Sequence, residues 1–579
     1  MSHSSAEKNV VVSIVLIMVI AAFFRFSALD LFPPGLYPDE AMNGNNALLA
    51  LNSNEPEGGF KMFYPDNNGR EGLFMNIIAV SISVSGNEPW AIRIVSSFFG
   101  LAAVLGVFLF ARELFRDRAG DLRIFGMNKN TLIALTASFF LATNFWHIIF
   151  SRIGFRAIMA PAFLAWGLYF LWLIFREDFS HNKKALAVAA GGILFGLGFH
   201  SYIAYRVVPV LLIFPFLMIW KIRKSFTFGK PGCLWCVFTL FIFFVFITVL
   251  PLWLYYIDNP ADFFGRTSQI SIFSSENPLK ILGSNLLKTL GMFWFSGDYN
   301  WRHNFAGAPQ LFWPIGLLFA LGIIVSVINI FSAKGGSASG GKKLSTRFLE
   351  VATSPEKFLG AWFFIGLFPV IFSAEGIPHA LRAIIIIPPV MIISAIGFIF
   401  LAEKIKIKID KNETAYPEYA HQLKRIRKEI VILFFVFMFA LLGASFNKYF
   451  LRWGPHPDVY SSFSGDYVKI GKWLNEKPQE ITKYVIINAS GTEVRIPGSN
   501  KTLPMPAQTV MYITDTWTAK NQQLRNFKYL RPDEINLITC DNKCYIALLE
   551  SDINIYRQIK LKIGEHFIYT DDGIILIEK

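Results

Sequence analysis

The chain has few cysteines and few charged residues for its length. Four cysteines occur among 579 residues, and none has further Cys or His residues at zinc-site spacing, so a zinc cluster is not expected. No glycine-rich Walker-type loop is present, so nothing points to a nucleotide as the energy source. Only 17% of the residues are charged, against about 25% in an average soluble domain. These absences argue against an ordinary soluble enzyme.

Apolar residues are abundant instead. Hydrophobic residues make up 53% of the chain, which has 59 Phe and a mean hydropathy of +0.43. These values are typical of membrane proteins. The formal charge is +14, but the Lys and Arg residues cluster in short loops between apolar runs. We interpret this excess as a topology signal and expect no nucleic-acid partner.

Long apolar runs predict a polytopic α-helical membrane protein with about eleven transmembrane helices, each near the 20 residues that cross a bilayer. The first run has no convincing cleavage site, so we interpret it as a retained helix. Two runs, 185–200 and 358–373, are short for a span, and the loss of one would reverse the side of the C-terminal region. The runs cover residues 9–29, 91–112, 130–150, 157–175, 185–200, 203–220, 234–256, 311–332, 358–373, 383–402 and 429–447.

The connecting loops predict the orientation. Placing the N-terminus in the cytoplasm puts five basic loops on that side, as the distribution of Lys and Arg in membrane proteins requires. With eleven spans the C-terminal region then lies outside the cell membrane. The five loops are 112–129, 176–184, 221–230, 334–357 and 404–428.

Three regions on the outer side are large enough to carry function. Residues 30–90 include a short apolar stretch, 73–84, which we interpret as a helix lying at the membrane interface. Residues 258–310 form a second outer loop. Residues 448–579 have the composition of a soluble domain, and they predict a small extracytoplasmic α/β domain behind a membrane domain that covers residues 1–447.

Short patterns predict the elements of this outer domain. Residues 467–475 favour a helix, and residues 484–488 and 509–514 favour strands. Residues 536–549 favour a hairpin that turns at 541–542. A glycine- and serine-rich stretch in the last-but-one basic loop, 334–342, is typical of a flexible linker.

The cysteines form two close pairs. Cys540 and Cys544 flank the predicted turn on the oxidising side. A disulfide that closes a short loop and a pair of unbonded cysteines are equal alternatives there. Cys233 and Cys236 lie near the cytoplasmic end of a span, where we expect reduced, buried thiols.

Two adjacent acids, Asp39 and Glu40, follow the first span. Pro38 suits the first position of a helix that residues 41–51 can continue, so both acids would lie in its first turn, where the helix dipole favours negative charge. An ionised Asp at the membrane surface can accept a proton from an attacking hydroxyl, or the pair can help to hold a divalent cation. The alternative is that the acids only complement the helix N-terminus on a solvated loop.

Basic residues on the same side could bind a phosphate. Arg70, Arg93, His379 and Arg382 lie at the edges of apolar runs, where charge-assisted hydrogen bonds can hold a phosphate group. His379 and Arg382 would share one face of a helix begun by Pro378, and could then meet a single anion. Arg93 could instead extend towards the interface without a ligand.

Further polar residues of the outer loops are weaker candidates. Glu71, Arg302 and His303 are candidate substrate contacts because they lie beside the residues above. Asp66 and Asp298 are single acids in loops, and we expect them to be solvated rather than catalytic.

Several motifs in this order resemble those of a known superfamily. They are Tyr37-Pro-Asp-Glu40 after the first span, Gly69-Arg-Glu-Gly-Leu-Phe74, Trp90-Ala-Ile-Arg93, Ser151-Arg152, Asn300-Trp-Arg-His-Asn304 and Gly376-Ile-Pro-His-Ala-Leu-Arg382. The series is similar to the protein O-mannosyltransferase and aminoarabinose lipid A transferase superfamily, the GT-C membrane glycosyltransferases, including family-39-like members. The resemblance extends over roughly residues 10–450.

The resemblance implies an inverting transferase on the outer face of the cell membrane. It would move a sugar from a polyprenyl-phosphate carrier to an acceptor hydroxyl, with no cofactor required and a divalent cation optional. Asp39 matches the acid assigned as catalytic base, and Glu40 matches the neighbour that supports the acceptor or a cation. Arg70 and Arg93 occupy the places of basic residues near the lipid phosphate.

One departure and two alternatives stand beside this interpretation. Aminoarabinose transferases carry a second acid at the start of the fourth span, where this chain has Phe155 and Arg156. A transporter or flippase of lipid-linked sugars would instead place ionisable residues at mid-bilayer in broken helices. An oligosaccharyltransferase-like enzyme would also use a first-loop acid, but it usually has a much larger soluble domain.

Overall fold

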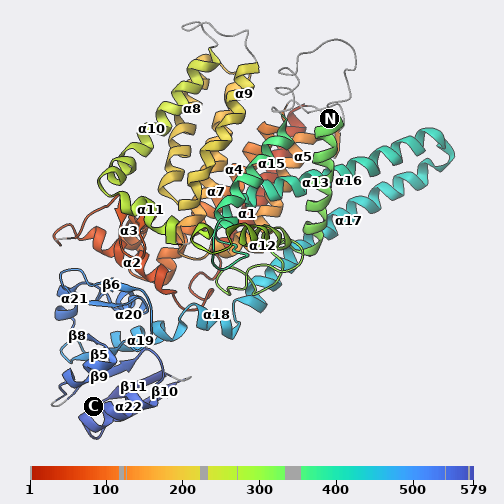
Figure 1. Cartoon of the computed structure of the whole chain (residues 1–579). Helices are drawn as coiled ribbons and strands as arrows, with labels where there is room; N and C mark the ends of the chain where they lie inside the picture. The colour runs from red at the N-terminus through yellow and green to blue at the C-terminus, as the bar shows by residue number, and fades with distance from the viewer. Residues whose placement is uncertain are drawn as a thin grey trace.

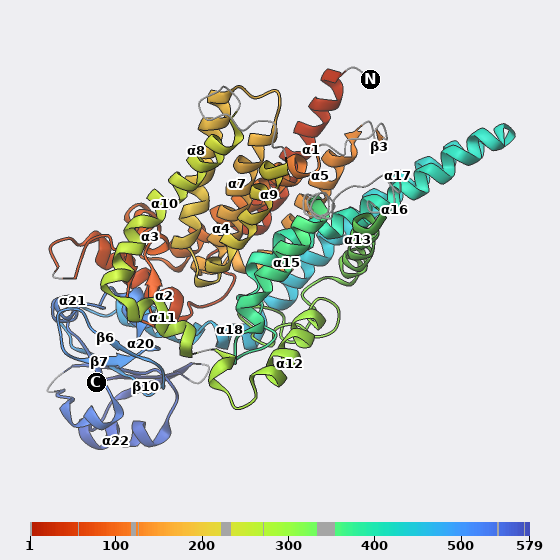
Figure 2. The ribbon, with the colours of Figure 1, turned by 45° about the horizontal axis from the view of Figure 1, so that its top comes forward.

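The computed structural model of the chain is a layer of helices with a small α/β domain at one end (Figure 1). It describes residues 3–55, 57–116, 123–124, 127–221, 233–269, 271–332, 354–540, 543–571 and 574–579. The predicted linker 334–342 and the predicted turn at 541–542 lie outside these ranges. In both views the N-terminus and the C-terminal domain lie at opposite ends of the helical layer (Figures 1 and 2).

Eight helical segments are long and apolar enough to cross a membrane, and each matches a predicted run. The other three predicted runs form the shorter helices α5 (Lys129–Thr143), α8 (His181–Leu197) and α15 (Pro355–Ile371). The described residues therefore form a multi-span membrane protein, and the total of eleven spans stays a prediction. The eight segments are Glu7–Phe26, Pro89–Leu114, Arg156–Phe175, Ile203–Trp220, Leu234–Asp258, Trp313–Phe331, Ile384–Ala415 and Pro417–Trp453.

Two of the central helices pack with their backbones in direct contact at glycine residues. A Cβ atom on Gly322 would lie 1.9 Å from the carbonyl oxygen of Ile393, and one on Gly397 would lie 2.2 Å from that of Leu318. Glycine at both positions therefore lets α13 and α16 approach closely, as small residues do in membrane bundles. The principal helices are α1 (His3–Phe26), α4 (Pro89–Leu114), α7 (Met159–Trp172), α9 (Ile213–Lys221), α10 (Leu234–Asp258), α13 (Trp313–Ser332), α16 (Ile387–Ala415) and α17 (Ala420–Phe446).

A buried arginine closes the end of the first helix. Arg152 is fully buried and donates hydrogen bonds to the carbonyl oxygens of Phe24 at 3.0 Å and Ala28 at 3.1 Å. Its Nε donates to the hydroxyl of Tyr449 at 2.9 Å. The last carbonyl groups of a helix have no hydrogen-bond partner within the helix. Arg152 supplies hydrogen bonds to carbonyl groups at the end of α1 and so holds the start of the outer loop.

The outer segments contain the expected helices. α2 (Pro38–Leu51) begins at Pro38 and places Asp39 and Glu40 in its first turn, which confirms the prediction. The predicted short helix is α3 (Leu73–Ser85), and its position at the interface stays a prediction. The second outer loop contains α11 (Pro260–Gln269) and α12 (Pro278–Gly291).

A five-stranded mixed sheet forms the core of the C-terminal domain, with strand order β10-β11-β9-β5-β8. Strand β5 pairs in parallel with β8 and with the central strand β9, whereas β11 pairs antiparallel with β9 and β10. The strands are β5 (Lys483–Ile486), β8 (Phe527–Leu530), β9 (Tyr545–Leu548), β10 (Phe567–Asp571) and β11 (Ile574–Glu578); the helices are α18 (Pro457–Ser462), α19 (Gly465–Asn475), α20 (Ala507–Thr514), α21 (Ala519–Leu524) and α22 (Ile553–Ile563).

Two local predictions in this domain are wrong. Residues 509–514 lie in helix α20 rather than in a strand, and all eight residues of α20 are buried. Residues 536–549 do not form a hairpin, since β9 pairs with β5 and β11 instead. In both cases long-range packing outweighs the β propensity of Thr, Val and Ile, which reflects fit to a surface more than an intrinsic preference. The predicted helix at 467–475 and strand near 484–488 are confirmed by α19 and β5.

Both cysteine pairs form disulfides. The bond between Cys540 and Cys544 agrees with one of our two alternatives. The bond between Cys233 and Cys236 contradicts the expectation of reduced thiols. Cys233 is the N-cap of α10 and Cys236 lies three residues later in its first turn, a spacing that places both side chains on one face of the helix.

Labelling from outside tests the predicted orientation. Lys560 is exposed on α22, so a membrane-impermeant maleimide should modify a Lys560→Cys variant in intact cells. A Lys408→Cys variant, exposed on α16, should react only after permeabilisation. The parent chain is the blank because its four cysteines are paired. Reaction of the two variants in the opposite order would contradict the predicted topology.

Candidate functional site

The two acids that begin α2 point in different directions. Glu40 is fully buried, and its carboxylate lies 3.1 Å from Nε of Arg93, which is also buried. The backbone N–H of Gly154 donates to the same carboxylate at 2.7 Å. Arg93 also donates to the carbonyl oxygens of Pro33 and Gly35, both at 2.6 Å. The pair therefore ties the loop between α1 and α2 to α4.

Asp39 remains half-buried at the other side of this turn. Its carboxylate accepts a hydrogen bond from the side-chain amide of Asn67. The neighbouring Tyr37 ring is covered by the guanidinium of Arg302, 3.7 Å from the ring centroid. Burial and the charge of Asp39 raise the pKa of Tyr37, although Arg302 acts in the opposite sense. Asp39 is thus an accessible carboxylate beside a fixed cation.

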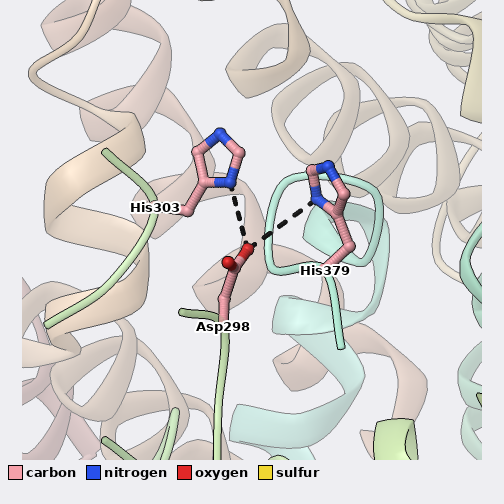
Figure 3. A group of neighbouring side chains, drawn as sticks. All are labelled: Asp298, His303 and His379. Carbon is pink, nitrogen blue, oxygen red and sulfur yellow. Dashed lines mark hydrogen bonds and ion pairs between the residues drawn. The ribbon is translucent and has the colours of Figure 1, made fainter. Parts of the chain in front are cut away.

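A second acid of the outer loops is buried between two histidines (Figure 3). Asp298 is 4% exposed, and its Oδ2 lies 3.0 Å from Nδ1 of His303 and 3.8 Å from Nδ1 of His379. The backbone N–H of Ala380 donates to the same oxygen at 2.8 Å. The expectation that Asp298 is solvated is therefore wrong, because two separate loops fold over it.

The charge of this acid is stabilised by its neighbours. Burial alone would raise the pKa of Asp298, but the hydrogen bond from His303 and the charges of His303 and His379 lower it below its ordinary 3.8. Asp298 therefore stays ionised at neutral pH. The ligand atoms of the three side chains lie within 4.8 Å of one another. In zinc sites, the distance from the Zn²⁺ ion to a His nitrogen or an Asp oxygen is about 2.0–2.2 Å. The three side chains are therefore grouped closely enough to share one such ion.

One aromatic ring connects the two acidic centres. The ring of Phe155 packs edge-on against Tyr37, with centroids 6.2 Å apart, and against His303, at 6.3 Å. Arg302 and His303 are adjacent in sequence, so one loop reaches both Asp39's neighbour Tyr37 and Asp298. The two centres are therefore connected through Phe155 and the loop that carries Arg302 and His303.

A third group of charges lies at the start of the fourth predicted span. Glu71 is buried, with Nε of Arg156 at 3.0 Å and a guanidinium nitrogen of Arg206 at 3.8 Å. Arg206 lies 4.2 Å over the ring of Phe263, and 23% of its side chain is exposed. Two arginines share one carboxylate, so the group carries a net positive charge.

The remaining predicted residues are held by the protein itself. Arg70 donates to the side-chain oxygens of Asn43, at 2.6 Å, and Asn46. Arg382 donates to Ser373 and to the carbonyl oxygen of Glu375 at 2.9 Å. The expected helix from Pro378 is wrong, because the next helical turn begins only at Ile384. His379 and Arg382 therefore do not share a helix face, and their binding to a single phosphate stays a prediction.

The C-terminal domain holds the helix that carries the acids. The side-chain amide of Asn45 on α2 donates to that of Gln508 on α20 at 2.8 Å. Thr509 donates to the carbonyl oxygen of Leu36 at 3.0 Å, and Tyr512 to that of Glu88 at 3.1 Å. The domain thus fixes the position of α2 relative to α4.

Some residues of the site could have been found in the sequence. Arg156 and Arg206 each precede an apolar run on the same side as Asp39, the signal that selected Arg93. Tyr37 belongs to the motif that contains Asp39. Asp298 gave no such signal, because its partner His379 lies in a distant loop.

Comparison with known proteins confirms the fold. No protein-family model and no curated protein matches the chain. Among solved structures, ArnT from Cupriavidus metallidurans bound to undecaprenyl phosphate superimposes with a TM-score of 0.56 at 12% identity, over 98% of this chain and 97% of that one. The apo state of the same protein gives a TM-score of 0.51 at 12% identity, over 99% and 98% of the two chains. The chain therefore has the overall fold of ArnT, as the resemblance of its motifs predicted.

Proposed function

We propose that the chain is an inverting glycosyltransferase that moves a sugar from a polyprenyl-phosphate carrier to an acceptor hydroxyl on the outer face of the cell membrane. The observation that carries this proposal is the half-buried Asp39, which shares the partner Tyr37 with Arg302, whose sequence neighbour His303 contacts Asp298. ArnT, which shares the fold, is known bound to undecaprenyl phosphate.

The geometry supports a simple division of roles. Asp39 accepts the proton of the acceptor hydroxyl as that oxygen attacks the anomeric carbon from the face opposite the phosphate. The bond between this carbon and the phosphate oxygen breaks, and the lipid phosphate leaves with the negative charge. Fixed cations stabilise that charge as it develops. Glu40 holds α2 in place through Arg93.

The structure adds two arginines to the donor-phosphate candidates. Arg70, Arg93, His379 and Arg382 stay proposed from the sequence, and like Arg206 they have hydrogen-bond partners within the protein. Arg156 and Arg206 share the single charge of Glu71 and lie at the start of spans. Charge-assisted, bidentate hydrogen bonds from such arginines suit a phosphate. We therefore place the donor phosphate beside Arg206.

A divalent cation is compatible with this site but is not required by the proposal. Asp298, His303 and His379 form a group that could hold one. Glu40, which the sequence offered as a ligand together with Asp39, already accepts from Arg93 and Gly154. A bound cation would supply further positive charge at this group.

The two alternatives are less well supported. A transporter of lipid-linked sugars would keep its ionisable groups at mid-bilayer, whereas Asp39, Glu71 and Asp298 lie in segments outside the eight apolar helices. An oligosaccharyltransferase-like activity would move a preassembled glycan, and the domain of residues 448–579 offers little additional surface for it. Mass spectrometry of lipid extracted from the purified protein tests the choice. A polyprenyl phosphate carrying one sugar supports the proposal, and a carrier with a long glycan contradicts it.

Replacing Arg206 is expected to weaken use of the donor. An Arg206→Gln variant should raise the apparent KM for the polyprenyl-phosphate sugar about tenfold, since a hydrogen bond to a charged group contributes roughly 1.5–3 kcal/mol. The KM for the acceptor should change little. An Arg525→Gln variant is the control, because Arg525 pairs with Asp515 in the C-terminal domain. An unchanged donor KM would remove Arg206 from the site, and Arg382→Ala then becomes the next test.

A further inference from the structure

Helices α16 and α17 extend beyond the helical layer as a long basic hairpin. In both views the pair leans away from the other helices, and its tip projects from the layer (Figures 1 and 2). The hairpin, residues 403–429, turns through a short helical segment, Pro417–Tyr419. It contains eight Lys or Arg residues and five Asp or Glu residues. The proposed function uses none of them.

Four of the five acids of the hairpin form ion pairs with basic residues of the protein. Asp410 lies 2.5 Å from Lys406 and 2.8 Å from Arg427, which joins the two helices. Glu429 pairs with Arg425 at 2.9 Å, and Glu403 pairs with Lys129 of α5 at 2.6 Å. Glu413 also pairs with Arg427, so Glu418 is the one acid of the hairpin without a basic group in ion-pair distance among the described residues.

Five lysines remain without a carboxylate in ion-pair distance among the described residues, and they follow one face of each helix. Lys404, Lys408 and Lys411 are spaced by four and three residues on α16, and Lys424 and Lys428 by four on α17. Residues at these spacings lie on the same face of a helix. All five are exposed. We call these five residues the lysine stripe.

The lysine stripe continues directly from the lipid-facing surface. On α17, Lys428 is followed four residues later by Ile432, which is 60% exposed, and then by Phe435 at 54%. On α16, Leu401 is 46% exposed and precedes Lys404 by three residues. Large apolar side chains exposed on a spanning helix face the lipid tails. The lysines on the same faces must therefore face the region where the lipid headgroups lie.

The distances along the helices agree with this placement. A helix rises about 1.5 Å per residue, so Lys404 lies about 4.5 Å beyond Leu401, Lys428 about 6 Å beyond Ile432, and Lys411 about 15 Å beyond Leu401. Ile405, Ile407 and Ile426 within the hairpin are also exposed. The headgroup region is about 5–8 Å thick on each side of the bilayer, and charge attraction extends about a further 8 Å at physiological salt.

We propose that the lysine stripe binds the headgroups of anionic lipids on the membrane face opposite the C-terminal domain. Clusters of four to eight basic residues beside a span are typical of such sites. The long apolar stems of Lys404 and its neighbours can lie along the interface while the ammonium groups meet lipid phosphates. This site is separate from the proposed catalytic centre and does not depend on the reaction.

A quenching experiment with the full chain tests this proposal. A fluorophore is placed on the hairpin through Gln422→Cys, and the protein is reconstituted in nanodiscs that contain a nitroxide on the headgroup of either an anionic or a zwitterionic lipid. We expect the anionic lipid to quench several times more strongly at equal content. Salt at 1 M, where charges are screened within about 3 Å, should abolish the difference.

Two charge variants complete the test. Changing the lysine stripe to glutamine should bring the ratio of anionic to zwitterionic quenching to about one, since each lysine near the surface contributes about fivefold. The control changes five exposed lysines of the C-terminal domain and should keep the preference. These lysines are Lys472, Lys528, Lys543, Lys560 and Lys562.

Three results would overturn the proposal. They are equal quenching by both lipids in the parent chain, a preference that survives 1 M salt, and a preference that survives loss of the lysine stripe. Weak quenching by both lipids would place the hairpin away from the bilayer and indicate a protein partner instead. The salt result comes from the parent chain, so it stands even if the five-lysine variant does not fold.

Discussion

Replacing Asp39 with asparagine is expected to lower sugar transfer at least about a hundredfold, because a general base contributes roughly 10²–10⁴-fold to a rate. The measurement is transfer from a labelled polyprenyl-phosphate sugar in membranes that contain equal amounts of each variant. Asparagine keeps an oxygen that can accept the hydrogen bond from Asn67, but it cannot take a proton. Protein levels should therefore remain normal.

An acid from the same outer region serves as the control. Asp66 is half-buried, and burial raises its pKa although Arg70 and Lys61 act in the opposite sense. Asp66 lies next to Asn67 but takes no part in the proposed chemistry. The Asp66→Asn variant should therefore retain most of the transfer activity. If Asp39→Asn is as active as the parent, Asp39 is not the base. If both variants lose activity equally, the loop rather than the carboxylate is responsible.

Replacing Arg93 with methionine is expected to lower the free energy of unfolding by about 3–5 kcal/mol, because Glu40 would remain buried without its partner. The two side chains are 1% and 0% exposed, so water cannot take the place of the guanidinium. Methionine preserves most of the volume and removes the charge. Unfolding in detergent micelles by increasing SDS, followed by tryptophan fluorescence, measures the change.

Two further variants identify the cause of that loss. The double variant Glu40→Gln with Arg93→Met removes the unpaired charge and should recover part of the stability. Arg525→Met breaks an ion pair whose arginine is 43% exposed, and it should cost at most about 1 kcal/mol. If Arg93→Met costs no more than Arg525→Met, then the buried pair does not hold the loop.

The stability and the activity of this site are connected through α2. Asp39 and Glu40 are consecutive residues in the first turn of the same helix, so loss of the Glu40 pair would also displace the proposed base. Arg93→Met should therefore reduce transfer as well as stability. The C-terminal domain contributes to the same support, since Gln508 and Tyr512 hold α2 and the start of α4 from the other side.

Local and compositional signals determined much of this protein. Runs of apolar residues predicted the spanning helices, because the length of a membrane helix is set by the bilayer and needs no tertiary contact. Pro38 predicted the start of α2 and the placement of both acids, because a proline ring fixes the backbone angle that a first helical residue adopts. The order of motifs predicted the fold.

Only the tertiary structure decided which charges meet. Asp298 and His379 lie in loops on different sides of α13 and α15 in sequence, and only folding brings them to 3.8 Å. Arg93, which the sequence could have offered to a ligand, instead pairs with Glu40. Residues 509–514 became a helix because both of their faces are buried against distant elements. A charged or β-branched side chain has the same local signal whatever it later contacts, so these outcomes depend on partners that no short stretch of sequence contains.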